Sequence, residues 1–287
     1  MTSVIVPVFN AGSVLDTTVP SVLALEGVDE WIWVNDGSTD DTQTRLSALL
    51  PSARAMRIVR LEENRGRGAA RNAGIEAATG DILVFFDADV KTPPEAAARL
   101  ASTLEGPDTI ASVARVRSVL DRPRDPYQRY LSRHARGARP TSGPVAWRYF
   151  LSGACALRRQ SLDDVGGFDE DIVYGEDFDL ACRLAGVSPR GLRLAETEVA
   201  VHNVGTLASA LENASAFGHS LARMAGRSPK VVQIAEIPRV ATHSFFAPFL
   251  PSPELLLRLV HGLPASVQPK GVRVALGLSL LRGFHRG

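Results

Sequence analysis

Cysteine and long apolar runs are both scarce in this sequence of 287 residues. Its two cysteines, Cys155 and Cys182, lack the spacing of a metal-binding motif, and free thiols in a reducing compartment are expected rather than a disulfide framework. No stretch reaches the roughly 18–20 apolar residues that a membrane-spanning helix needs. Because no basic segment precedes the first apolar residues, we expect no secretory signal and a cytoplasmic protein.

An excess of charge of either sign is also lacking. The formal net charge is +1, so no global field favours nucleic acid as a partner. The charge is uneven, however, because residues 227–287 hold eight lysines and arginines against two glutamates. Only three lysines occur beside frequent alanine and arginine, which we interpret as typical of a GC-rich bacterial genome.

Short apolar runs alternate with helical stretches in the first half of the chain. We predict strands at residues 4–8, 31–34, 56–61 and 82–86, and helices at about 13–25, 39–50 and 68–78. This alternation favours βαβ units and a mainly parallel sheet, in which ligands bind beyond the carboxyl ends of the strands. Asp36 and Asp87 both follow such ends. No Gly-x-Gly-x-x-Gly follows the first strand, which argues against a Rossmann dehydrogenase.

Asp87 and Asp89 follow the apolar run that ends at Phe86. Residues two apart on a strand project from the same side, so the two carboxylates would repel each other without a cation. Mg²⁺ binds through one or two carboxylates and leaves other positions to substrate phosphates. Taken alone, the pair also fits a plain polar exit from a strand.

The second half is less regular. We predict strands at 110–119, 151–157 and 194–202, a partly helical basic stretch at 122–139, a helix that starts near Glu176, and C-terminal helices at 252–263 and 272–284.

Six segments then occur in the order found in a known family. They are VIVPVFN from Val4, VNDGSTDDT from Val34, ENRGRGAARNAG from Glu63, FDAD from Phe86, GGFD from Gly166 and GEDFDL from Gly175. Together they resemble glycosyltransferase family 2. The resemblance implies an α/β GT-A fold, with a Rossmann-like, mainly parallel sheet flanked by helices. It covers residues 4 to about 205.

The resemblance also implies a domain organisation and an activity. Residues 1–205 would be the catalytic domain, with a nucleotide-donor half at 1–90 and an acceptor half at 91–205. Residues 206–287 lie beyond the resemblance, and their own pattern predicts a basic helical appendage. The enzyme would be an inverting glycosyltransferase of hexosyltransferase type. It would use Mn²⁺ or Mg²⁺ to move a sugar from a nucleotide-diphosphate donor, with UDP the commonest donor nucleotide among similar enzymes, to an acceptor hydroxyl. The acceptor would be a carbohydrate, a lipid-linked molecule or a small molecule.

Individual roles follow from matching positions. The implied roles are Asp177 as catalytic base with Glu176 in support; Pro7, Asp36, Arg67, Arg71 and Asp87 on the donor; Asp89, Asp87 and His202 on the metal; and Gly153 and Ala154 beside the acceptor. Each position also has a structural reading. Asp36 could cap a helix, the arginines could form a solvated face, the acids could stabilise the first turn of a helix, and the small residues could serve strand packing.

Two alternative functions and three roles for the appendage stay open. An inactive nucleotide-sugar-binding scaffold is one alternative. A nucleotidyltransferase is the other, although the expected Gly-rich loop with a basic residue is missing after the first strand. The apolar, basic C-terminal helices could cover the sheet or form a homodimer. They could instead dock on an anionic membrane surface, which would place the protein on the inner face of the membrane.

Overall fold

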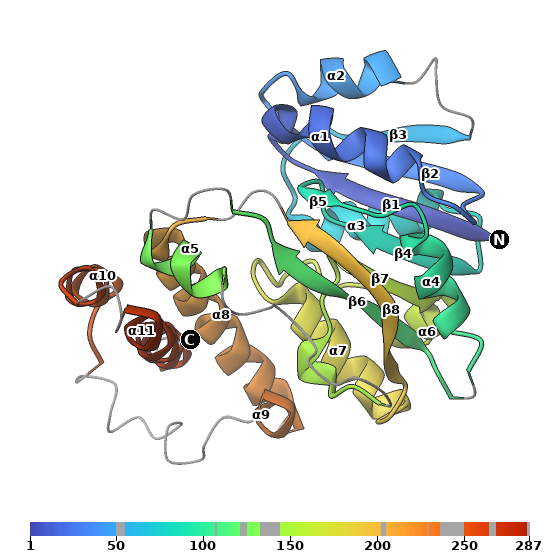
Figure 1. The fold of residues 1–287 in the computed structure, drawn as a ribbon. Coiled ribbons are helices and arrows are strands. Elements are labelled where there is room, and N and C mark those ends of the chain that lie inside the picture. Colours follow the sequence, from blue (N-terminus) through green and yellow to red (C-terminus); the bar gives the residue numbers. More distant parts are fainter. Residues whose placement is uncertain are drawn as a thin grey trace. The chain divides into compact units, whose positions relative to one another are not determined.

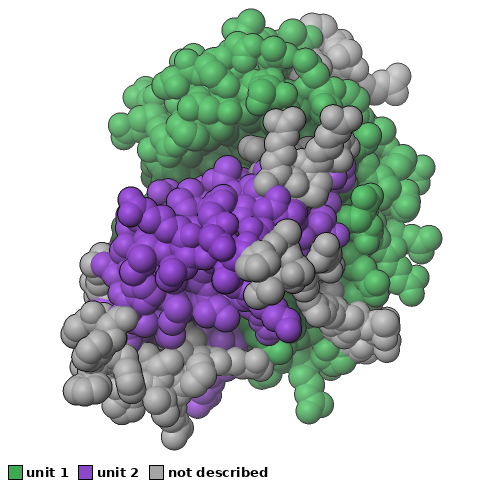
Figure 2. Space-filling model, turned by 60° about the vertical axis from the view of Figure 1, so that its left-hand side comes forward, with its two compact units in different colours: residues 1–117, 136–203 green, residues 118–135, 204–287 purple. Residues whose placement is uncertain are grey.

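The computed structural model describes residues 1–49, 55–106, 108–120, 125–132, 144–201, 205–228, 230–235, 250–263 and 268–285. The chain divides into two compact units (Figure 2). Unit 1 comprises Met1–Arg117 and Arg136–Asn203, and unit 2 comprises Ser118–Ala135 and Val204–Gly287. Residues 118–135 therefore group with the C-terminal helices, whereas our predicted boundary at 205 stays a prediction.

In the residues that the structure describes, eight strands form one sheet in the order β3-β2-β1-β4-β7-β6-β8-β5 (Figure 1). Their bounds are β1 Thr2–Val8, β2 Glu30–Asp36, β3 Met56–Leu61, β4 Ile82–Phe86, β5 Val90–Lys91, β6 Ala111–Ser118, β7 Ala154–Arg158 and β8 Leu192–Val201. Strands β3, β2, β1 and β4 run parallel, as predicted, and β7 joins β4 in the antiparallel direction. The α/β class is confirmed.

The central strand β1 sets the register of the parallel half. Val4 pairs with Trp31 of β2 and with Val84 of β4, and every residue of β1 is buried. Parallel strands in register present their carboxyl ends at one edge of the sheet. The segments after β1, β2 and β4 therefore meet there.

Helices connect and cover these strands. In unit 1 they are α1 Gly12–Leu23, α2 Thr42–Leu49, α3 Arg67–Ala77, α4 Ala96–Thr103, the 3₁₀ helix η2 Trp147–Tyr149, α6 Arg159–Val165 and α7 Glu176–Val187. The prediction that α2 starts at 39 was wrong by three residues. The amides of Thr39 and Asp40 donate to the Asn10 side chain, so the helix begins only after them.

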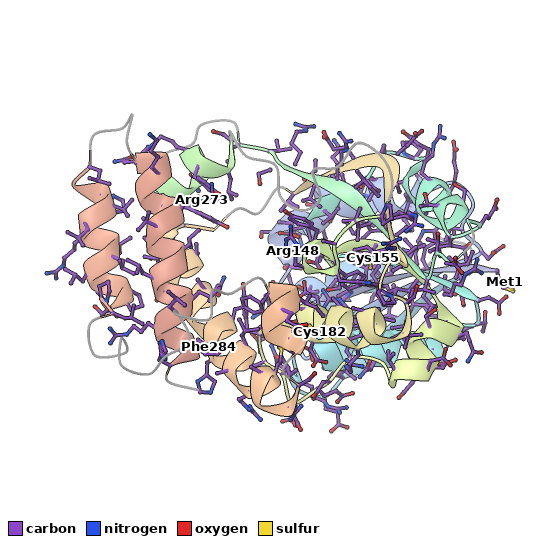
Figure 3. The ribbon with its side chains drawn as sticks, turned by 90° about the horizontal axis from the view of Figure 1, so that it is seen from below. Met1, Arg148, Cys155, Cys182, Arg273 and Phe284 are labelled. Atoms are coloured by element: carbon purple, nitrogen blue, oxygen red, sulfur yellow. The ribbon has the colours of Figure 1, made fainter. Side chains whose placement is uncertain are left out.

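Both cysteines lie in unit 1 as free thiols (Figure 3). Cys155 of β7 is buried and Cys182 of α7 is half-buried. Burial raises the pKa of both thiols, and that of Cys182 rises to about 12. Neither is therefore a ready nucleophile.

Unit 2 is helical. Its elements are α5 Pro126–Leu131, α8 Leu207–Arg227, α9 Lys230–Ala235, α10 Pro253–His261 and α11 Gln268–Phe284. Ser252 caps α10 by accepting a hydrogen bond from the amide of Leu255 at 3.3 Å, as the Ser-Pro-Glu sequence predicts. Helices α8 and α11 touch at glycine, since a Cβ on Gly218 would lie 1.9 Å from the carbonyl oxygen of Leu280. Within the described residues, no helix has the length and apolarity needed to cross a membrane.

Candidate active site

A cavity of about 310 Å³ lies beyond the carboxyl ends of β1, β2 and β4. Its lining comes from four stretches of unit 1: Pro7, Val8, Phe9, Asn10, Ala11, Ser13 and Val14; Asp36; Arg67 and Ala70; and Asp87, Ala88 and Asp89. Five of the residues that the resemblance singled out thus share one cavity. The sheet register brings them together from positions up to 82 residues apart in the sequence.

Asp36 ends β2 and is buried. Its carboxylate accepts hydrogen bonds from the amides of Arg65 and Gly66 at 2.8 and 3.0 Å. Burial raises the pKa of Asp36, although these two hydrogen bonds oppose the rise. The carboxylate therefore fixes the loop that leads into α3, and its remaining lone pairs are the ones open to a ligand in the cavity.

Asn10, the last residue of the VIVPVFN segment, lines the cavity, although the sequence analysis gave it no role. Its φ of +48° lies in the left-handed region, which asparagine tolerates better than most residues. Its Oδ1 accepts a hydrogen bond from the amide of Thr39 at 2.9 Å, and its own amide donates to Ser38 Oγ at 3.0 Å. The loop after β1 is thereby tied to the loop after β2. It presents Phe9, 45% exposed, to the cavity.

Arg71 and Glu176 form a buried ion pair beside the cavity. The side chains are 1% and 2% exposed, and Arg71 Nη1 lies 2.8 Å from Glu176 Oε1. Arg71 Nη2 lies 2.7 Å from Asp87 Oδ1, so one guanidinium joins two carboxylates. Burial lowers the pKa of Arg71, but the charges of Asp87 and Glu176 outweigh burial and raise it overall. The group stays charged.

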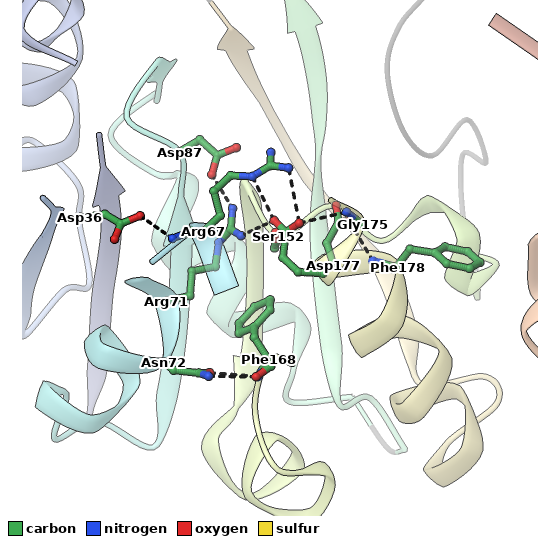
Figure 4. A network of polar contacts seen from close by, with 12 residues as sticks. Asp36, Arg67, Arg71, Asn72, Asp87, Ser152, Phe168, Gly175, Asp177 and Phe178 are labelled. Atoms are coloured by element: carbon green, nitrogen blue, oxygen red, sulfur yellow. Dashed lines mark hydrogen bonds and ion pairs between the residues drawn. The ribbon is translucent and has the colours of Figure 1, made fainter. Parts of the chain in front are cut away.

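Arg67 lies one turn before Arg71 but in different surroundings. Its side chain is 48% exposed, borders the cavity and packs with its guanidinium 4.9 Å from the centre of the Tyr174 ring. Its Nε lies 3.3 Å from Glu176 Oε1. Figure 4 shows both arginines between Asp87 and the start of α7. Of the two, Arg67 has the free surface that a donor contact would need.

Asp177 lies in the first turn of α7 and is partly buried. Burial and the adjacent Glu176 carboxylate raise its pKa to about 6, against the opposing charges of Arg71 and Arg67. Its Oδ1 accepts a hydrogen bond from the amide of Phe178 at 2.8 Å. Gly175 precedes the helix with a φ of +91°, a conformation that favours glycine. A carboxyl whose pKa lies near neutrality suits proton transfer.

Gly153 and Ala154 lie against the Asp-x-Asp segment. A Cβ on Gly153 would come within 2.2 Å of Asp87 Oδ2, and the amide of Asp87 donates to the Gly153 carbonyl at 3.0 Å. Ala154 pairs with Phe86 across the antiparallel ladder. The small residue at 153 thus makes room for the Asp87 carboxylate. A contact with the acceptor stays a prediction.

The donor set for a divalent cation consists of carboxylates. Asp87 and Asp89 border the same cavity, and only one of the two Asp87 oxygens pairs with Arg71. In the part of the chain that the structure describes, no cluster of three His, Cys, Asp or Glu side chains is arranged to hold a metal. Two carboxylates nevertheless fit Mg²⁺ or Mn²⁺ when diphosphate oxygens complete the coordination. His202, the third predicted ligand, lies outside the described residues.

Comparisons with known proteins place the chain among glycosyltransferases. The pre-mycofactocin glycosyltransferase of Mycobacterium tuberculosis is 31% identical over 244 residues, covering 79% of this chain and 48% of that protein. The chain spans about half, or less, of the length of the curated relatives that it matches.

Among the solved structures of similar fold are two from different organisms. S. aureus TarS 1–349 has a TM-score of 0.62 at 16% identity, with 99% of this chain and 89% of that chain covered. The mannosyltransferase PcManGT from Pyrobaculum calidifontis has a TM-score of 0.57 at 22% identity, with 98% of this chain and 86% of that chain covered. These likenesses confirm the predicted GT-A fold.

The family assignment comes from the sequence match. A model of the family described as "Glycosyl transferase family 2" matches residues 3–166, more than half of the chain. The match includes Asp36, Arg71, Asp87 and Asp89. The protein therefore belongs to glycosyl transferase family 2.

Proposed function

We propose that this protein transfers a sugar from a nucleotide-diphosphate donor to an acceptor hydroxyl, with inversion at the anomeric carbon and with Mn²⁺ or Mg²⁺ bound. The single observation that carries the proposal is the cavity in which Asp36, Asp87 and Asp89 meet Arg67, at the carboxyl ends of the parallel strands. In open α/β sheets this edge is where ligands bind.

The donor nucleotide would enter between the loops after β1 and β2. Phe9 offers an exposed aromatic face to a base, and Asp36 offers acceptors for a base N–H or a ribose hydroxyl. TarS has been crystallised with UDP and with UDP-GlcNAc, and PcManGT with GDP-Man and Mn²⁺. A UDP-sugar is our first candidate donor and a GDP-sugar our second.

Asp89 and Asp87 would hold the metal, together with oxygens of the donor diphosphate. A bound divalent ion offsets negative charge on a leaving nucleoside diphosphate. Arg67 would add a positive charge on the same side of the cavity, since its exposed guanidinium borders the space that the diphosphate would fill. Asp177 would take the proton from the acceptor hydroxyl as that oxygen attacks the anomeric carbon opposite the leaving group.

The acceptor partner and the role of unit 2 stay open. Three apolar side chains of the C-terminal helices are exposed, Leu255 at 48%, Leu259 at 58% and Val274 at 61%, and exposed basic residues lie beside them: Arg258, Lys270 and Arg273. Such faces suit an anionic membrane surface, as a lipid-linked acceptor would require. Flotation with anionic vesicles tests this, with neutral vesicles as the control. Sedimentation at several concentrations tests the homodimer.

Release of nucleoside diphosphate from a panel of UDP-, GDP- and dTDP-sugars tests the proposed activity. We expect release from one nucleotide class, dependent on Mn²⁺ or Mg²⁺ and lost in Asp89→Asn. If the protein binds a nucleotide but forms no nucleoside diphosphate from any of the donor sugars, with or without added acceptors, the inactive scaffold is favoured.

A further inference from the structure

Arg71 has no surface left for a substrate. Its side chain is 1% exposed and it does not line the cavity, whereas Arg67, one turn earlier in α3, does. Both terminal nitrogens already pair with carboxylates, and Nε is buried without a hydrogen-bond partner among the described residues. The sequence resemblance implied a donor contact for Arg71, but its surroundings indicate another role.

The two carboxylates on Arg71 belong to opposite sides of the proposed reaction. Asp87 follows β4 and borders the donor cavity, at 2.7 Å from Nη2. Glu176 begins α7, next to the proposed base Asp177, at 2.8 Å from Nη1. These partners lie 16 and 105 positions from Arg71 in the sequence.

The guanidinium of Arg71 packs against the ring of Phe168. It lies 5.5 Å from the centre of the Phe168 ring. The amide and carbonyl of Phe168 both bond to the side chain of Asn72, each at 2.9 Å, and Figure 4 shows this pairing below the arginines. Since Asn72 follows Arg71 in α3, one helix positions both the guanidinium and the ring beneath it.

We propose that Arg71 is a positioning residue that fixes Asp87 relative to Glu176, and thereby fixes the spacing between the donor site and Asp177, without touching either substrate. The inference rests on the proposed function, because it takes the cavity as the donor site and Asp177 as the base.

Only arginine fits this role. Its planar guanidinium presents two Nη groups in fixed directions, whereas a lysine ammonium is a single point charge on a flexible stem. Lysine at 71 would keep the positive charge but could hold only one carboxylate firmly. Misplacement by about 1 Å between reacting groups costs about 10²-fold in rate.

Arg71→Lys therefore separates positioning from binding. We expect the kcat for donor turnover to fall about 30- to 100-fold. The Kd for the nucleotide that the wild-type protein binds, measured with Mn²⁺, should change less than about threefold. The control is Arg67→Lys in the same helix, for which we expect the larger loss of donor affinity, seen as an increase in Kd. A circular dichroism spectrum and melting curve verify that both variants fold. A loss of donor affinity in Arg71→Lys as large as the loss in kcat would overturn the inference, as would unchanged kcat.

A double-mutant cycle with Glu176→Gln tests the mechanism. If both residues act through one contact, the double variant loses little more kcat than Arg71→Lys alone, whereas additive losses would contradict the proposal. A crystal structure of Arg71→Lys gives a readout that does not depend on turnover. A shifted Asp87 or Glu176 carboxylate supports the inference even if no donor is turned over, and unmoved carboxylates reject it. Absence of turnover in the wild type would instead count against the proposed function.

Discussion

Glu176 and Asp177 are neighbours in the first turn of α7, yet their carboxylates have different surroundings. Glu176 is buried and paired with Arg71 and Arg67, whereas Asp177 is partly exposed and accepts a hydrogen bond from the amide of Phe178. Burial, together with the adjacent charge of Glu176, raises the pKa of Asp177 to about 6. Two adjacent acids are thereby given separate roles, one in the ion-pair network and one in proton transfer.

Asp177→Asn should keep donor binding and lose most transfer. The variant removes the proposed base but leaves Asp36, Asp87 and Asp89 in place, and a positioned general base contributes about 10²- to 10⁴-fold. We would measure the kcat for transfer and the Kd for the nucleotide in the variant and in the wild type. Asp163→Asn in α6, an exposed acid, is the matched control and should behave as the wild type. Turnover of Asp177→Asn at the wild-type rate would reject Asp177 as the base.

The pH dependence of turnover should report the same carboxyl. Asp177 acts as a base only when ionised, so kcat/KM should rise as the pH increases through about 6. Rates measured across this range in overlapping buffers at constant ionic strength test the expectation. A profile that is flat around this pH would contradict it.

The free energy of unfolding should fall with increasing pH where turnover rises, and Asp177 causes both effects. Its pKa is 3.8 ordinarily and about 6 when folded, so the folded state binds a proton that the unfolded state has already lost. The free energy of unfolding therefore decreases as the pH rises through this window. Asp177→Asn should be more stable than the wild type by about 1–2 kcal/mol at about pH 8, and nearly equal to it at about pH 4. Melting curves at both values measure this, and equal differences at both would contradict it.

Gly37→Ala should destabilise unit 1. Gly37 has a φ of +64°, and a Cβ there would lie 2.4 Å from the carbonyl carbon of Glu63. Strain and crowding together should cost about 2–4 kcal/mol. The control is Gly186→Ala, an exposed position in α7 with no heavy atom within 4 Å, which should gain up to about 1 kcal/mol. Equal denaturant midpoints for the two variants would contradict the strain and crowding described at Gly37.

Gly218→Ala should destabilise the helices of unit 2. The added Cβ would lie 1.9 Å from the Leu280 carbonyl oxygen, so α8 and α11 would have to move apart, at about 2–3 kcal/mol. Gly226→Ala, also in α8 but in open space, is the control. Denaturant unfolding of both variants provides the comparison, and a Gly218→Ala midpoint at or above the control would contradict the packing.

The parallel half of the sheet and the convergence of Asp36 with Asp87 were predictable because they follow from local patterns. Apolar runs predict strands, and parallel strands present their ends at one edge. The environment of Arg71 was not predictable in this way, because Glu176 lies 105 positions away and no local pattern indicates that a guanidinium will be buried. The late start of α2 likewise depends on Asn10, about 30 residues earlier in the chain.

Asn10 could have been noticed from its residue type. Asparagine adopts the left-handed conformation more readily than most residues, and Asn10 closely follows the first predicted strand. Which loop Asn10 binds could be learned only from the fold. His202, one of the predicted metal ligands, stays a prediction because it lies outside the described residues.

Nucleotide-dependent thermal stabilisation tests the central claim most directly. With Mn²⁺ present, UDP or GDP at about 100 times its Kd should stabilise the wild type by about 2.7 kcal/mol. We expect Asp177→Asn to keep this shift and Asp89→Asn to lose it. An equal shift in Asp89→Asn, or no shift with any nucleotide in the presence of Mn²⁺, would contradict a metal-assisted donor site in this cavity.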